Sequence, residues 1–359
     1  MKFLRLAFYV MIAQLVLSGC AGEGVEETSS SSSSEINFDA YLGRNASTRA
    51  GVTDITSLKG TASNSGFGVF ARYNHNGATS LLMDNEHVTW NGNRWGYTNT
   101  RYWPNEGSVD FYAFAPYNVK QLVNKPKSSE ANPTYIEFTS STSPVDLVWG
   151  AQTGQEAPAS PTDSKVKFEF KHALARLGFD ITVNQDLEKN GAVIQVEEVK
   201  LYGKTENEGV FDIKGYLNLE NGEWYVDPDY GTRVVYTWTP GVEDGTNLKL
   251  SASQLDDTCT KIENAPNSYL CIIPQQKYRS FYLKITYTVK QGTFEEKEMV
   301  AVSKDLLEVL QPGVRDPSFE FVKGKAYVFH LKLSLDPVKF SVTTKVEDWK
   351  EGKNETMIL

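Results

Sequence analysis

Residues 281–290 read Phe-Tyr-Leu-Lys-Ile-Thr-Tyr-Thr-Val-Lys, with a large apolar side chain at every second position. The same alternation recurs in residues 165–171 and 327–334. A period of two places the apolar residues on one face of a β-strand and the polar residues on the other. The three segments therefore predict strands that bury one face, and they favour an all-β fold.

Hairpin turns are predicted where Asn-Gly stands between strand-like segments, at Asn91-Gly92 and Asn221-Gly222. This dipeptide suits the two-residue turns that join adjacent strands, because both residues accept a positive φ. Helical periodicity is confined to residues 172–177 and 304–310, each of which we expect to form a helical turn or two.

The N-terminus has the features of a secretory signal. Lys2 and Arg5 precede an apolar run over residues 6–17, which is shorter than the roughly 20 residues of a spanning helix. The run ends in Leu17-Ser18-Gly19-Cys20, which resembles the bacterial lipobox, whose cysteine receives a diacylglycerol and becomes the first mature residue. We therefore predict a lipoprotein signal peptide over residues 1–19 and lipidation at Cys20. The alternative is an ordinary signal with a chance cysteine.

Residues 20–35 are predicted to form a lipidated, Ser-rich tether. They contain three glutamates in residues 21–27 and a run of serines over residues 29–34, and such a segment cannot bury a core. The acidic stretch is similar to the surface-export tag of Bacteroidetes lipoproteins. Several acyl chains on one residue are enough for stable membrane attachment, so we expect a surface-exposed lipoprotein of the outer membrane.

The length of the chain suggests two domains after the signal peptide, since 340 of the 359 residues follow residue 19. Residues 155–164 contain two prolines and small residues, which is typical of a linker. We therefore predict an N-terminal β-sandwich domain over residues 36–162 and a C-terminal β-sandwich domain over residues 163–359.

The charge of the chain excludes one class of partner. Lys2 and Arg5 belong to the signal peptide, so the 36 basic and 45 acidic side chains become 34 and 45, a net charge of −11. An acidic surface repels phosphate backbones, and we expect no nucleic-acid partner.

Two cysteines remain after Cys20, namely Cys259 and Cys271. In an oxidising compartment an even pair suggests a disulfide, and residues 263–267 between them could turn the chain back. Two free, buried thiols are the alternative. Neither cysteine belongs to a C-x-x-C motif, so a zinc or redox role is disfavoured.

No catalytic or cofactor-binding motif is found: the P-loop, dinucleotide, zinc-protease and nucleophile-elbow patterns are all missing. We therefore predict no enzyme activity, no cofactor and no metal. The strongest metal alternative is a pair formed by His75 and His87 across a loop. We expect His172 to be a structural, hydrogen-bonded residue and His330 to be solvated. A surface hydrolase ranks last among the functions.

Several segments resemble motifs of one family, the fimbrillins. Tyr102-Trp103-Pro104, followed by residues 109–117, is similar to that family's YWP…FxAYxP signature. Residues 168–177 resemble its FxHALAxL entry to the second domain. Further resemblances, in chain order, are found in residues 67–71, 146–150, 209–212, 222–224 and 346–349. Most of the aromatic residues in the signature are expected to be core and turn material.

The resemblance implies two tandem transthyretin-like β-sandwich domains and a role as a subunit of Bacteroidia-type pili, as shaft, anchor or tip, or as a related adhesin. The implied partners are other fimbrillin subunits, whether copies or paralogues, and host or bacterial surface receptors or glycans. A monomeric, carbohydrate-binding surface lipoprotein is the alternative. A planar cluster of exposed aromatic side chains on one face would favour that alternative.

Assembly by strand exchange is the last expectation. Residues 36–42 have the alternation of a strand, and a small, polar segment with two arginines follows. In the fimbrillins that the chain resembles, a trypsin-like protease cuts after an arginine here and releases the first strand. We favour Arg49, with Arg44 as the alternative, and the C-terminal region around Val338, Phe340, Val342 and residues 357–359 as the replacement strand. A permanent first strand is the competing hypothesis.

Overall fold

The alternating segments of the sequence form strands, as predicted. In β22 (Tyr282–Gln291) the side chains of Leu283, Ile285 and Tyr287 are buried, and those between them are partly exposed. β9 (Lys165–Glu169) alternates in the same way, and so does most of β25 (Lys325–Leu333). Strands make up nearly all the regular structure, so the all-β fold class is confirmed.

The computed structural model describes most of the chain after residue 33. The described residues are 34–42, 55–119, 122–123, 134–140, 145–160, 165–183, 192–226, 233–238, 248–250, 260–261, 269–277, 279–315, 317–334, 337 and 341–348. Within these residues, no helix has both the length and the apolar character that crossing a membrane requires.

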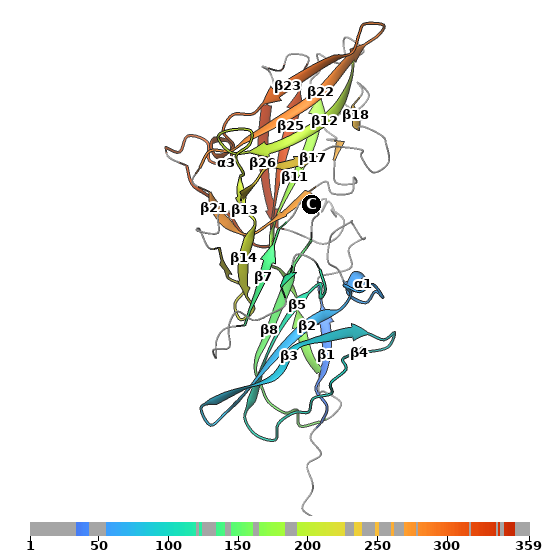
Figure 1. Ribbon diagram of the computed structural model, residues 1–359, viewed down its shortest axis with the longest axis vertical. Helices are drawn as coiled ribbons and strands as arrows, with labels where there is room; N and C mark the ends of the chain where they lie inside the picture. Colours follow the sequence, from blue (N-terminus) through green and yellow to red (C-terminus); the bar gives the residue numbers. More distant parts are fainter. Residues whose placement is uncertain are drawn as a thin grey trace, which may run out of the picture. The chain divides into compact units, whose positions relative to one another are not determined.

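The first core cluster is built by a six-stranded antiparallel sheet and a parallel strand pair (Figure 1). The pair consists of β1 (Asn37–Tyr41) and β9. The sheet contains, in spatial order, β10 (Lys171–His172), β8 (Val148–Gln155), β5 (Ser108–Ala115), β2 (Phe67–His75), β3 (Ala78–Trp90) and β4 (Trp95–Gly96). Large aromatic side chains from both parts, such as Phe67, Phe111 and Phe168, meet in this cluster.

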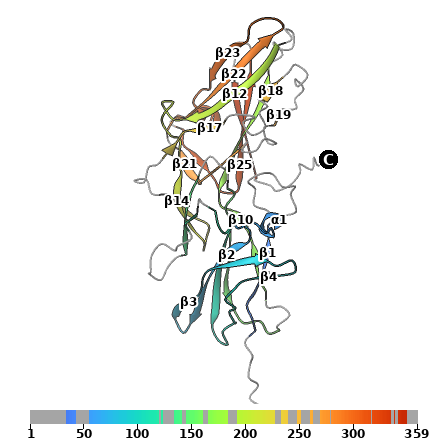
Figure 2. The ribbon, with the colours of Figure 1, turned by 45° about the vertical axis from the view of Figure 1, so that its right-hand side comes forward.

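A second core cluster lies between two further sheets, as in a β-sandwich (Figures 1 and 2). One sheet contains β19 (Thr260–Lys261), β11 (Ala175–Val183), β25 and β26 (Ser341–Asp348) in order, and β20 (Tyr269–Ile272) also pairs with β11. The other contains β17 (Tyr236–Trp238), β12 (Ala192–Tyr202), β22 and β23 (Lys297–Val302), with β18 (Leu248–Leu250) also on β12. Two short pairs add β13 (Phe211–Asp212) with β16 (Arg233–Val234) and β21 (Gln275–Lys277) with β24 (Phe319–Phe321).

One sheet joins residues from both sides of the predicted linker. It contains, in order, β15 (Trp224–Tyr225), β14 (Lys214–Asn218), β7 (Tyr135–Thr139) and β6 (Leu122–Val123). Its inner face forms a third core cluster with Phe70 and Phe114 of the six-stranded sheet. β2 and β5 thus have buried side chains on both faces, which explains their continuous apolar runs. The domain boundary at residue 163 stays a prediction. β9, which follows it, pairs with β1 and packs in the first cluster.

Both Asn-Gly sites lie in hairpin turns, and Gly92 and Gly222 have positive φ angles of 97° and 71°. The turns are longer than the predicted two residues, because residues 91–94 connect the paired Trp90 and Trp95. The other turn connects Leu217 and Trp224.

One of the two helical expectations is confirmed. Residues 304–310 contain α3 (Leu306–Leu310), and a further short helix is α1 (Ile55–Leu58). The helical expectation for residues 172–177 is wrong. His172 pairs with Val148 in β10 and Ala175 begins β11, so tertiary pairing overrides the helix propensity of the Ala-Leu-Ala sequence.

Candidate assembly site at the first strand

The segment over residues 34–41 has backbone partners in two distant parts of the chain. It pairs in parallel with β9, from Asn37 opposite Lys165 to Tyr41 opposite Glu169. The chain just before β1 bonds to residues 101–103: the Ile36 amide donates to the Arg101 carbonyl (2.9 Å) and the Trp103 amide donates to the Ser34 carbonyl (2.9 Å). The predicted strand over residues 36–42 therefore lies inside the fold, bonded to two segments that are distant in sequence.

The side chains of this segment fill the first core. Ile36, Phe38 and Leu42 are buried, and Phe38 is only 2% exposed. The Phe38 ring stacks on Phe168 at 5.9 Å between centroids and meets Phe111 edge-on at 6.0 Å. Burying three large apolar side chains contributes roughly 5–9 kcal/mol. Removing β1 would expose an apolar groove lined by these rings.

Tyr97 forms hydrogen bonds that connect Ile36, just before β1, with Arg101. Its hydroxyl donates to the Ile36 carbonyl (2.8 Å) and accepts from the Arg101 amide (3.1 Å). Burial raises the pKa of Tyr97 to about 12, and the nearby charges of Glu35 and Glu86 act in the same direction. The hydroxyl is therefore neutral, and able to donate, at physiological pH.

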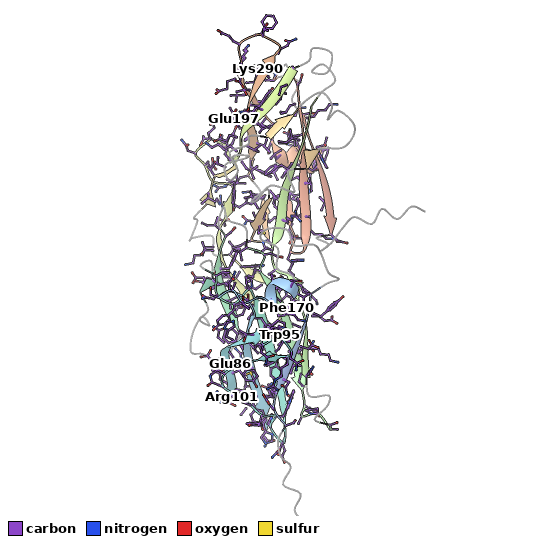
Figure 3. All side chains as sticks on the ribbon, turned by 90° about the vertical axis from the view of Figure 1, so that its right-hand side faces the viewer. Glu86, Trp95, Arg101, Phe170, Glu197 and Lys290 are labelled. Atoms are coloured by element: carbon purple, nitrogen blue, oxygen red, sulfur yellow. The ribbon has the colours of Figure 1, made fainter. Side chains whose placement is uncertain are left out.

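Figure 3 labels residues at both ends of this segment. Arg101 is the partner of Ile36 at one end, and at the other the Phe170 amide donates to the Tyr41 carbonyl (2.9 Å). Trp95, which also belongs to the first core, lies between them in that view. The site that removal of β1 would expose thus extends from residues 101–103 to Phe170.

The last described strand, β26, is held differently. It pairs antiparallel with β25 from Lys332 opposite Ser341 to Lys325 opposite Asp348, and it lies at the edge of its sheet. Of its side chains that the structure describes, none is buried: Val342 packs partly against the second core and Val346 is 49% exposed. Lys325 and Asp348 form an exposed ion pair that raises the pKa of the lysine. β26 is attached mainly through its backbone.

Several residues predicted from the sequence fall outside the described part of the chain. They are Cys20, Arg44, Arg49, Cys259, Val338, Phe340 and residues 357–359. Cys271 is described: it is buried, and burial raises the pKa of its thiol well above the usual value. The Cys259–Cys271 disulfide stays a prediction, because one of the two cysteines is not described.

The histidines lie far apart. His75 pairs with Ala78 at one end of the β2–β3 hairpin and His87 pairs with Gly68 at the other, which at about 3.3 Å per residue separates them by roughly 20 Å. The structure does not bring the two together. His87 instead stacks on Tyr117, with 3.7 Å between ring centroids. Among the described residues, no group of His, Cys, Asp or Glu has a geometry suited to a metal ion.

His172 is a structural residue, as predicted. Its Nδ1 lies 2.9 Å from Oδ1 of Asp146, and that carboxylate is buried. His330 is half-buried on β25 rather than solvated. The contact that sequence reasoning missed is the one between the start of β1 and residues 101–103. The only signal was the Tyr102-Trp103-Pro104 motif, of which Trp103 is buried and Tyr102 is exposed.

The chain is similar to known fimbrial proteins along most of its length. It is 24% identical to the fimbrium subunit Fim1C of Phocaeicola vulgatus over 96% of both chains. It shares its fold with a fimbrial protein from Bacteroides vulgatus, with a TM-score of 0.62, 22% identity and coverage of 88% of this chain and 99% of that one. A candidate cell adhesion protein from Bacteroides uniformis has a TM-score of 0.50, 18% identity and coverage of 88% and 99%. The family model described as fimbrillin-like matches residues 48–349. With that match over most of its length, the chain belongs to the fimbrillin-like family.

Proposed function

We propose that this protein is a structural and adhesive subunit of a cell-surface fimbria, exported as a lipoprotein and assembled with other fimbrillin subunits by exchange of its first strand. The observation that carries the proposal is the burial of Ile36, Phe38 and Leu42 in the first core, on a segment whose backbone bonds to β9 and to residues 101–103. A strand held in this way can be replaced by a strand of similar pattern from another subunit.

Release of the first strand requires a cut in the chain. β1 ends at Tyr41 and α1 begins at Ile55, and both arginines lie in the segment between them. While this segment is intact, β1 is tethered and rebinds at a high effective concentration. Cleavage after Arg49, or after Arg44, removes that advantage. The emptied groove then presents apolar rings and unpaired backbone groups, which favour the binding of a new strand.

The C-terminal region has a pattern that suits this groove. Val338-Lys339-Phe340 repeats the order of Ile36-Asn37-Phe38, with a β-branched residue two positions before a phenylalanine. The neighbouring strand β26 has no buried side chain among those described, so β26 can leave its sheet at lower cost than β1. A C-terminal segment from one subunit can therefore occupy the groove of the next.

Lipidation of Cys20 would hold the subunit in the outer membrane before assembly. The support is the signal-like N-terminus and the similarity to Leu-Ser-Gly-Cys lipoboxes. Mass spectrometry of the mature N-terminus should find an acylated cysteine. An unmodified N-terminus elsewhere, with Cys20→Ala still bound to the membrane, would contradict anchorage at this residue.

The central test treats the full chain carrying Cys20→Ala with an arginine-specific protease and follows its size by chromatography. We expect cleavage to convert monomers into higher species, and Arg49→Ala to prevent this while Arg44→Ala does not. A pair of substitutions, Asp39→Cys and Lys167→Cys, places cysteines at directly paired positions of β1 and β9, within the usual Cα separation for a disulfide.

The locked protein should be cut but remain monomeric until a reducing agent is added. Since only the retention of β1 differs between the oxidised and reduced samples, the comparison isolates strand release. Strand exchange is wrong if the cut, reduced protein stays monomeric after β1 has dissociated, or if the uncut protein polymerises equally well.

A further inference from the structure

The sheet that joins the two sides of the linker has two unlike faces. Its inner face carries Ile136, Phe138 and Leu217, which are buried in the third core cluster. Directly paired residues of neighbouring strands point to the same side of a sheet. Tyr216 of β14 pairs with Tyr225 of β15 and with Glu137 of β7, so these side chains share the outer face.

Three tyrosines gather on this outer face. Tyr216 and Tyr225 are directly paired, a position that places their Cβ atoms about 5 Å apart. Tyr135 lies two residues before Glu137 on β7, so it is diagonal to Tyr216, at a separation of about 7–8 Å. Tyr225 is 52% exposed, and the other two rings are half-buried. We call these three residues the tyrosine platform.

A charged pair borders the platform. Nζ of Lys214 lies 2.7 Å from Oε1 of Glu137, and both side chains are partly exposed. Thr139 and Asn218 also lie on this face by register, and β6 borders it through the pairing of Val123 with Glu137.

We propose that the tyrosine platform binds a neutral oligosaccharide. The C–H groups on one side of a pyranose ring pack against the electron-rich face of an aromatic ring, while its hydroxyls need polar partners. The three rings supply the apolar contact, and the carboxylate of Glu137 and the ammonium group of Lys214 supply polar partners. Because Glu137 and Lys214 neutralise each other, the described residues of this face offer no excess positive charge for a sialylated or sulfated glycan.

In the part of the chain that the structure describes, the other exposed aromatic side chains do not form such a cluster. Tyr102 pairs with Glu35 near the start of β1, and Tyr41 lies at its end, roughly 20 Å away along the strand. Phe294 lies in the turn between β22 and β23. Tyr102 is 55% exposed, nearly the same as Tyr225, which makes it a matched control for the loss of an exposed tyrosine.

The proposal does not depend on strand exchange, because the platform lies on β7, β14 and β15 and not on β1. It adds a ligand to the proposed adhesive role. The test can therefore use the monomer, and a failure of strand exchange would leave its outcome unaffected.

The experiment applies the full chain carrying Cys20→Ala to an array of neutral, sialylated and sulfated oligosaccharides, followed by calorimetry with the neutral glycan that binds most strongly. We expect Tyr225→Ala to weaken binding about tenfold. Tyr225→Phe, which keeps the ring, should stay within about threefold of the parent. Tyr102→Ala should bind like the parent, and circular dichroism checks that each variant is folded.

The proposal is overturned if no neutral glycan on the array binds, if only sialylated or sulfated glycans bind, or if Tyr225→Ala and Tyr102→Ala bind equally well. Because Tyr225 is the most exposed of the three rings, its substitution tests the platform without disturbing the core. Capture of a second protein subunit at this face, with no glycan bound, would also contradict it.

Discussion

The first and last described strands differ in what attaches them to the protein. β1 pairs with β9 in a two-stranded sheet, the residues just before it bond to residues 101–103, and the segment over residues 36–42 buries Ile36, Phe38 and Leu42. β26 lies at a sheet edge, pairs only with β25 in the described part of the chain, and has no buried side chain among those described. One strand is held by side chains and backbone together, and the other mainly by backbone.

This difference decides how each strand can leave. Opening β26 breaks hydrogen bonds that water replaces, so the net cost per bond is small. Opening β1 also exposes a cluster of aromatic rings, which costs far more. A strand of the first kind can leave by thermal fluctuation, whereas a strand of the second kind needs a cut in the chain to make its loss permanent. The two strands therefore suit the roles of donor and occupant in strand exchange.

The largest predicted effect is on stability. Phe38→Ala leaves a cavity among four aromatic rings, and we expect a loss of about 3–5 kcal/mol. Phe294→Ala makes the same chemical change at a side chain that is 73% exposed, and should alter stability by less than about 0.5 kcal/mol. Urea unfolding of both variants measures the difference. Equal midpoints would show that β1 is not held by its side chains.

Hydrogen exchange should show the second-largest difference between β1 and β26. Amides of β26 that bond to β25 should exchange by local opening of the edge, while amides of β1 that bond to β9 should require a larger opening. We expect exchange in β26 to be at least about a hundredfold faster, measured by mass spectrometry of peptides that cover each strand. Similar protection in both strands would contradict the comparison.

The sequence predicted the strands better than their partners. The alternation in residues 281–290 and 165–171 reports burial of one face, which depends only on spacing, and both segments are strands with the expected faces. It could not predict that β1 pairs in parallel with β9, because the two are more than 120 residues apart and pairing depends on the whole fold. The helical expectation at residues 172–177 failed for the same reason.

The candidate site was predictable only in part. The alternation that includes Ile36 and Phe38 predicts a buried strand, and the burial of both side chains confirms this prediction. Tyr97 gave no signal, because its role depends on a hydroxyl reaching the Ile36 carbonyl across the fold. The sequence did not predict the tyrosine platform either, because Tyr135 and Tyr225 come together only through the pairing of β7 with β14 and of β14 with β15.

Raising the pH should weaken the attachment of β1, because Tyr97 loses its proton. Its pKa is about 12 in the folded protein and 10 as the ordinary value, so the folded state holds the proton more tightly. The stability from this difference is fully present below pH 10 and is lost as the pH rises towards 12. Between pH 9 and pH 11.5, the free energy of unfolding of the parent should fall by roughly 1 kcal/mol more than that of Tyr97→Phe, after a reduction for solvent screening. Urea unfolding of both proteins at each pH measures this difference. Parallel curves for the two proteins would exclude a contribution from Tyr97.

The smallest effect is expected at the end of β26. Lys325 and Asp348 form an ion pair whose side chains are 42% and 63% exposed. Such a pair gains little in water, since solvent screens the charges and both side chains lose freedom. Lys325→Met and Asp348→Asn should each shift Tm by no more than about 1 °C, and the shift should shrink further at 1 M salt. Differential scanning calorimetry at low and high salt measures this. A shift of several degrees in either variant would mean that a side-chain contact helps to hold the last strand, and the contrast with β1 would then be weaker than the burial of the two strands indicates.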